Sequence, residues 1–369
     1  MNPILVKNIT IKEVNFKQRL REINQDKNKS LKNALSYIEF LNSGIDGESL
    51  LPERSKFEVD FDIHDTCSGF ANGIRKCIID EIPICSMTMD EEMFETNDRY
   101  ILSDDLQKNI DLIPILQEID IEKAKKWKIS LDVLNSTDEV ISVKSGDIEI
   151  YEGKKKIAVE SIMSSNISIM DLHPAKFLRI KEIRIIQGFS KDDSAKFATV
   201  SNTRYEIQDM KPLAHNIEEK DSGTSSLTHD PTKFHIGYTT YRNVKDPKII
   251  ILKCCDTLGE RLSAFSKELD NIQEDKKTKV ISHFSTFLDV ETKNDFKFFN
   301  FKNESWTLVN MISQYCFLLD KNIPFVAPAI IHPSTEIGVV KIKHRNPVKI
   351  IKDAIGSIQR DIEILKKAF

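Results

Sequence analysis

The sequence predicts an α+β fold in which one strand–helix unit occurs twice in a single chain. The first unit is FEVDFDI (57–63) followed by HDTCSGFANGIRKCIIDEIP, and the second is FKFFNF (296–301) followed by KNESWTLVNMISQYCFLLDKNIP. When Asn72 is aligned with Asn310, both read as a strand, a short polar turn, an amphipathic helix and an Ile-Pro pair. This duplication suggests a pseudo-dimer built from one polypeptide, which suits a body that holds partners better than one that binds a small substrate.

Two long helices give a second match between the units. They are predicted over 247–273 and 347–369, each opening with Pro and each ~22–26 residues, or roughly 33–39 Å, long. Asn346 is the predicted N-cap of the second one. Apolar residues recur in both at three- and four-residue spacing, so we expect the helices to pack against each other or each against the strand–helix layer of the other unit. The coincident positions are Ile251, Cys255, Leu258, Leu262, Phe265 and Leu269 in one helix and Ile351, Ile355, Ile358, Ile362, Leu365 and Phe369 in the other.

The remaining elements of the first unit follow from local patterns. Residues 3–14 alternate in polarity and predict a strand, whereas 17–50 are polar and lysine-rich and predict a surface insertion with a short helical patch at 31–41. Thr66 is the predicted N-cap of the first repeat helix, and Pro83 ends that helix. The apolar face of the helix consists of Phe70, Ile74, Cys77 and Ile78.

Residues 113–227 have no counterpart in the second unit. Their short alternating segments, separated by polar turns, predict a β-rich domain inserted into the first unit, with a flexible loop at 216–231. The predicted strands are 127–133, 140–143, 157–159 and 177–186 in the insertion, and 233–242 and 339–342 ahead of the long helices. The predicted domains are 1–112 with 228–275, the insertion 113–227, a linker 276–292 and the second unit 293–369.

Composition argues against several function classes. With 369 residues the chain buries a large core, and its net charge of −4 argues against nucleic acid as the main partner, since phosphate binding favours a basic surface. We find no run of about 18 apolar residues that would span a membrane and no secretory signal pattern at the start. The six scattered cysteines indicate reduced thiols in an intracellular protein, and the 12 glycines form no phosphate-binding motif.

Few residues offer chemistry of their own. His64 and Cys67 could form a base and a nucleophile, yet no third residue orients them, and a turn cysteine beside a surface histidine is the favoured interpretation. Asp60 and Asp62 share a strand face and form either a carboxylate pair or, as we favour, a solvated surface. Because neither CxxC nor HxxxH occurs, we predict no metal. Because no convergent triad and no glycine-rich cofactor motif is visible, we predict no catalytic residue and no cofactor. The basic segment GFSKDDSAKF (188–197) is either a solvated turn or a loop that docks on a partner.

Three segments carry a resemblance to a known family. FEVDFDIHDTCSGFANGIRKCIIDEIP (57–83) resembles the dimerisation segment of the α-like, third-largest subunit of DNA-dependent RNA polymerases. FETNDRYILSDDLQKNIDLIPI (94–115) continues the match with the family's Glu-Thr-Asn, Leu-x-Asp and Leu-Ile-Pro motifs. IRIIQGFSKDDSAKFATVSNTRYEI (183–207) is similar to a family loop, with Ser194 in place of the usual His. The matching loop positions are Gly188, Lys191, Asp192, Ala195, Lys196 and Phe197.

The second unit resembles the small α-like subunit that pairs with the third-largest one. Its signature Glu-Asp-His-Thr-Leu-Gly-Asn stands here as ESWTLVN (304–310), with three of seven positions changed, and Phe325 and His332-Pro333 match further on. Two α-like units in one chain look like the arrangement in large DNA viruses that transcribe in the cytoplasm. The four-cysteine zinc site that the family often carries in its inserted domain is not expected, because 113–227 contains no cysteine.

The resemblance implies a non-catalytic assembly subunit of an RNA polymerase. It implies a platform for the second-largest and then the largest catalytic subunit, contacts with small zinc-binding polymerase subunits, and DNA contact only through the complex. The expected location is intracellular: virion and host cytoplasm for a viral protein, nucleus for a cellular one. The alternatives that stay open are a stand-alone dimeric scaffold and a hydrolase. The predicted dimerisation and partner-binding residues are Phe70, Asn72, Ile74, Arg75, Cys77, Ile78, Glu81, Pro83, Gly188, Lys191, Lys196, Leu258, Leu262, Phe265, Leu308, Asn310, Ile351, Ile355, Ile358 and Ile362.

Overall fold

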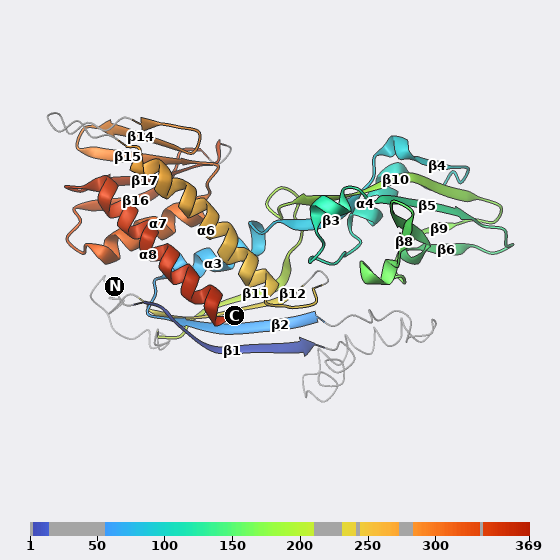
Figure 1. The fold of residues 1–369 in the computed structure, drawn as a ribbon, viewed down its shortest axis with the longest axis horizontal. Helices are drawn as coiled ribbons and strands as arrows, with labels where there is room; N and C mark the ends of the chain where they lie inside the picture. Colours follow the sequence, from blue (N-terminus) through green and yellow to red (C-terminus); the bar gives the residue numbers. More distant parts are fainter. Residues whose placement is uncertain (1–2, 15–55, 210–230, 241–243, 273–282, 333–334) are drawn as a thin grey trace, which may run out of the picture.

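The structure is a computed structural model in which two sheets and four helices form one lobe, and a smaller β-rich lobe lies beside it (Figure 1). The predicted insertion at 17–50, its helical patch and nearly all of the predicted loop 216–231 lie outside the described residues. Among the described helices, none combines the length and apolarity of a membrane span. The residues described are 3–14, 56–209, 231–240, 244–272, 283–332 and 335–369.

Two sheets of the larger lobe repeat one topology. The strand order is β1-β2-β12-β11 in the first and β13-β14-β15-β17-β16 in the second, with antiparallel neighbours throughout. The registers agree as well, because Phe61 lies opposite Ile236 and Phe299 opposite Val340. The strands are β1 (Leu5–Val14), β2 (Lys56–His64), β11 (Val200–Ile207), β12 (Lys233–Thr240), β13 (His283–Phe284), β14 (Leu288–Lys293), β15 (Phe296–Lys302), β16 (Phe325–Ile330) and β17 (Ile337–Lys343).

Four helices complete the two units. In each unit a helix follows the second strand of the shared pattern and a longer helix follows the last one, so the order strand, strand, helix, strand, strand, helix occurs twice. From here on, the first unit comprises β1, β2, α3, β11, β12 and α6, and the second comprises β13 to β17, α7 and α8. The helices are α3 (Ser68–Asp80), α6 (Ile249–Asp270), α7 (Trp306–Leu319) and α8 (Pro347–Ala368).

The helix starts differ in part from prediction. The N-cap of α3 is Cys67 rather than Thr66, and its side chain makes no capping bond. Asn346 is the N-cap of α8, as predicted, but without a side-chain bond, so Pro347 in the first turn carries the start signal. At α7 the Ser305 hydroxyl accepts a hydrogen bond from the Thr307 amide, which is the capping that the other two lack.

The two long helices run antiparallel across each other, as Figure 1 shows, and each ends on the sheet of the other unit. The ring of Phe265 in α6 meets Phe301 of β15 edge-on with centroids 4.9 Å apart, and Phe369 beyond α8 meets Phe61 of β2 at 5.1 Å. One continuous apolar core therefore spans both units. The predicted packing of these helices against each other and onto the partner layer is confirmed.

The smaller lobe, here the inserted body, spans residues 84–188 and has its own core. It begins at β3 and ends at β10, whose terminal residues Ile84 and Gly188 lie opposite each other. The predicted insertion 113–227 is thus displaced at both ends, because β3 and α4 belong to this lobe and β11 belongs to the first sheet. The α+β class is confirmed. The helices and strands of the inserted body are β3 (Ile84–Thr88), β4 (Phe94–Thr96), α4 (Ser103–Asp111), α5 (Ile121–Ala124), β5 (Lys128–Leu134), β6 (Ile141–Lys144), β7 (Ile148–Glu152), β8 (Lys155–Ile157), β9 (Ser168–Leu172) and β10 (Phe177–Gly188).

Candidate assembly interface

The interface between the units begins with the contact of α3 with α7. Glycines bring the helices close: a Cβ on Gly73 would lie 2.2 Å from the Met311 terminal methyl group. The Gly69 amide donates a 2.7 Å hydrogen bond to the Gln314 side-chain oxygen. Most of the predicted apolar residues are buried in this shared core, namely Phe70, Ile74, Cys77, Ile78, Leu258, Leu262, Phe265, Leu308, Ile351, Ile355, Ile358 and Ile362.

Three of the polar residues predicted for this interface, Asn72, Arg75 and Asn310, are only half-buried. Asn72 accepts two hydrogen bonds on its side-chain oxygen from the Arg75 guanidinium, at 3.1 Å from Nε and 2.8 Å from Nη2. Arg75 is therefore held along its own helix, and Asn310 occupies the equivalent half-buried position on α7. A contact of either residue with a large subunit stays a prediction.

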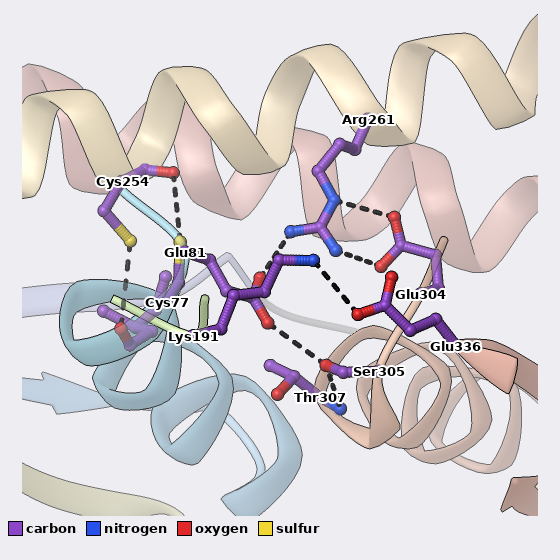
Figure 2. Close-up of polar contacts among 10 residues, drawn as sticks. Cys77, Glu81, Lys191, Cys254, Arg261, Glu304, Ser305, Thr307 and Glu336 are labelled. Carbon is purple, nitrogen blue, oxygen red and sulfur yellow. Dashed lines mark hydrogen bonds and ion pairs between the residues drawn. The ribbon is translucent and has the colours of Figure 1, made fainter. Parts of the chain in front are cut away.

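Arg261 of α6 joins both units through one guanidinium (Figure 2). Its Nε donates to Glu304 Oε1 at 2.7 Å, Nη2 bonds the other oxygen of Glu304, and Nη1 bonds Glu81 at the end of α3. The Ser305 hydroxyl donates to Glu81 at 3.1 Å. These contacts tie the C-terminus of α3 and the N-terminus of α7 to α6. Glu81 was predicted as an interface residue, but Arg261 was not.

Charge and burial make this network sensitive to protonation. The Glu304 side chain is only 3% exposed, and burial raises its pKa to about 7 although Arg261 opposes that rise. The negative charge of Glu81 adds to the upward shift, because two carboxylates share one cation. Burial works to lower the pKa of Arg261, but both carboxylates outweigh it and raise that pKa. The guanidinium therefore stays charged while Glu304 titrates near neutrality.

The predicted docking loop 188–197 contacts both the second unit and the inserted body. Exposed Lys191 pairs with Glu336 of the second unit at 3.5 Å, as Figure 2 shows. Lys196 is mostly buried and bonds Asp111 and Thr88 of the inserted body, each at 2.9 Å. Our interpretation of both lysines as free docking residues needs correction for Lys196, whose ammonium is engaged within the chain.

Gly188 has a steric role in the same loop. A Cβ at this position would lie 2.5 Å from the ring of Phe197, which is buried at the far end of the loop. The loop therefore folds back on itself at this point, and a larger residue would push the aromatic ring out of place.

A groove of about 730 Å³ lies next to the Arg261 network. Its walls come from both units, from α6 and from the loop at Lys191. Trp306 is 50% exposed and Phe287 45% exposed there, which are high fractions for such large apolar side chains. Pro83 and Phe189 also line the groove. In this groove, apolar surface of the interface is therefore exposed to solvent.

The carboxylates predicted as a solvated pair are largely engaged on the first sheet. Asp62 is 5% exposed and accepts hydrogen bonds from Asn8 at 2.6 Å and from Gln208 and His235 at 2.8 Å each. Burial works to raise the pKa of Asp62, but these bonds outweigh it and lower that pKa. Asp60 accepts a 2.7 Å bond from Arg204. The solvated-face interpretation was therefore wrong.

Cys67 and His64 show no catalytic arrangement. Cys67 lies in the turn between β2 and α3, as predicted, and is 9% exposed. Burial raises the pKa of its thiol to about 11, so it carries no thiolate near neutral pH. His64 lies at the end of β2 with a buried Nε2 that has no hydrogen-bond partner. Among the described residues, no group of His, Cys, Asp and Glu side chains is arranged to hold a metal ion.

Comparison with known proteins bears on the second unit. Residues 298–368, which run from β15 to the end of α8, match the family model described as the RNA polymerase Rpb3/Rpb11 dimerisation domain. The second unit is therefore a domain of the Rpb3/Rpb11 type, and the match supports an RNA polymerase α-like assembly subunit. A search of curated protein sequences found no match to the chain.

Proposed function

We propose that this chain is a non-catalytic assembly subunit of a DNA-dependent RNA polymerase, with two α-like units fused in one polypeptide. The observation that carries the proposal is the agreement between the units: residues 298–368 match a polymerase dimerisation domain, and the first unit has the same strand order, register and helix placement. The shared core supports a permanent pseudo-dimer. Its role is to nucleate association of the two large catalytic subunits.

The proposed partners are the largest and second-largest polymerase subunits and the small zinc-binding subunits, with DNA reached only through the complex. The exposed aromatic groove at Trp306 supports a protein contact on this side of the pseudo-dimer. We further propose an intracellular location: the virion and the host cytoplasm if the source is a large DNA virus, and the nucleus if it is a cell.

Affinity purification of the protein from its native source tests this function. Two co-purifying chains well above 100 kDa, together with template-dependent RNA synthesis, are the expected result, since roughly such sizes are needed for large catalytic subunits. A chain recovered alone, or with unrelated partners, contradicts the proposal and favours a free scaffold. Turnover of a substrate by the purified single chain favours the hydrolase.

A further inference from the structure

The two units carry opposite charges at one equivalent position. Arg261 in α6 and Asp361 in α8 coincide in the alignment that places Leu258 on Ile358 and Leu262 on Ile362. Both lie on the interface side of their helices, with the Arg261 side chain 24% exposed and that of Asp361 fully buried. Burying a charge costs free energy unless a partner compensates it. The stability of a pair of units therefore depends on which residue lies opposite each of these two charges.

Each charge lies at the start of the short helix of the other unit. Arg261 of the first unit bonds Glu304, the residue before the α7 N-cap Ser305. Asp361 of the second unit accepts a 2.7 Å bond from the Tyr315 hydroxyl and lies near Thr66, the residue before the α3 N-cap.

Asp361 lies beside the end of β2 that leads into α3. Its carboxylate accepts a hydrogen bond from the Ile4 backbone amide, and the neighbouring Leu5 lies opposite His64, two residues before Thr66. The alignment of Asn72 with Asn310 places Thr66 on Glu304 and the N-cap of α3 on that of α7. The two charge sites are therefore related by the pseudo-twofold symmetry of the units.

We propose that these charges make each unit select the other one and reject an identical unit from a second chain. In a pair of two second units, Asp361 would face Glu304, which brings two buried carboxylates together. The cation beside Asp361 is Arg360 of the same helix, at 3.6 Å from Oδ1, and its side chain is 48% exposed, so it offsets the repulsion only in part. In a pair of two first units, Arg261 would keep Glu81 but would face Thr66 where Glu304 now lies. The apolar seams of α6 and α8 coincide in both units, so between these two helices the discrimination falls to position 261 and position 361. It adds to the steric match of α3 with α7, where Gly73 aligns with Met311.

A competition experiment on the full chain tests this selection independently of the polymerase proposal. A protease site is placed within 273–282, the folded protein is cut there, and both pieces are unfolded in urea, refolded together and counted by native mass spectrometry. The wild-type pieces should form unlike pairs, each of one first and one second piece, in about tenfold or greater excess over like pairs of two identical pieces. Like and unlike pairs in statistical proportion would overturn the proposal.

The deciding variant is Asp361→Arg, which gives the second unit its own complement to Glu304. Pairs of two second pieces should rise about tenfold over wild type. Glu363→Arg is the matched control, because it makes the same charge change at an exposed position of α8 and should leave the ratio unchanged. If Asp361→Arg does not refold, Asp361→Asn removes the repelling charge without adding bulk and should raise like pairs by a smaller factor. An equal rise in like pairs with Glu363→Arg, or no rise in like pairs with any variant that refolds, contradicts the selection.

Discussion

At the scale of single residues, the interface depends on one guanidinium between two buried carboxylates. Replacing Arg261 with Met keeps much of the side-chain volume but leaves Glu304 buried without its cation. We expect a loss of about 3–5 kcal/mol in the free energy of unfolding, measured by urea denaturation. Adding Glu304→Gln to that variant should recover part of the loss. Lys267→Met on the exposed side of α6 is the control, and an equal loss there would contradict the assignment.

The same carboxyl predicts a pH dependence. Burial raises the pKa of Glu304 from 4.5 to about 7, so between these values the folded state binds more protons than the unfolded state. The free energy of unfolding should therefore fall as pH rises from about 4.5 to 7, and level off above that. The buried Asp361 carboxyl, whose pKa burial also raises, contributes with the same sign. Thermal melts across this range should show a reduced slope in Glu304→Gln, and an unchanged slope would count against the assignment.

The sequence predicted which residues are buried far better than which charges meet. Apolar spacing marks the core face of a helix without knowledge of the rest of the fold, so Ile74 and Ile358 were predictable. Arg261 lies between Leu258 and Leu262 of the apolar seam. This interruption of the apolar pattern is the one local sign of its role in the sequence. Its partner Glu304 is far away in sequence and lies just before another helix, α7, which no periodicity reveals. Asp62 was missed for the same reason, because its partners come from β1, from β12 and from the residue that follows β11.

At the scale of elements, α8 is the helix whose apolar seam reaches both units. Ile358 is fully buried in the shared core, so Ile358→Asp would bury a carboxylate with no partner there. Because truncating a core Ile alone typically costs about 2–5 kcal/mol, the variant should be insoluble or melt at a much lower temperature. Lys349→Asp on the exposed face near the helix start should be nearly neutral. Equal melting temperatures for the two variants would contradict the paired-helix arrangement.

Lys352 is a poorer control than the sequence suggests. It lies opposite the apolar seam of α8, yet its ammonium pairs with Asp270 of α6. Lys366 and Asp256 pair at the other end of the crossing, and Gln359 donates to the Ser263 hydroxyl at 2.9 Å between them. The two helices thus share a polar border, which spacing alone does not indicate. Exposed pairs of this kind contribute about 0–1 kcal/mol each, so the apolar seam remains the main source of stability.

At the scale of the whole molecule, a partner should bind on the side where the aromatic groove opens. Trp306→Ser would remove half-exposed apolar surface from the groove while leaving the buried face of α7 intact. We expect an unchanged melting temperature for the free protein and a clear drop in the yield of large subunits on affinity purification. Large exposed aromatics at protein interfaces often contribute about 2 kcal/mol or more. Phe317→Ser, on the exposed side of the same helix, serves as the control.

The docking loop makes a related prediction with a narrower variant. Lys191→Glu changes an exposed residue whose charge faces Glu336, so the free protein should lose no more than about 1 kcal/mol. Assembly yield should fall, and more so at low salt, if Lys191 also meets an acidic partner. Lys196→Glu would instead place a carboxylate beside Asp111 and destabilise the fold itself. A yield that is independent of Lys191 at every salt concentration would argue against docking there.

The architecture was predictable where the chain repeats itself and not where strands pair over long distances. Both units were visible because two local patterns recur with aligned positions. The inserted body begins near 84 rather than 113 because β3 pairs with β10, a contact that leaves no trace in local composition. The motif at 95–97 likewise proves structural in the described fold, since Thr96 and Asn97 hydrogen-bond the Phe177 backbone at 2.6 and 2.9 Å.

The pairing of Ile84 with Gly188 has a consequence for how far the inserted body can be changed in length or sequence. The chain leaves the first unit and returns to it at adjacent residues of one antiparallel ladder. For the rest of the first unit, everything between them is equivalent to a short hairpin, and its length adds little closure entropy. The second unit has only a turn at the matching point between α7 and β16. The inserted body could therefore be shortened or exchanged at this position. Among the described residues, its contacts with α6, with the segment before α6 and with the loop after β10 would have to be replaced.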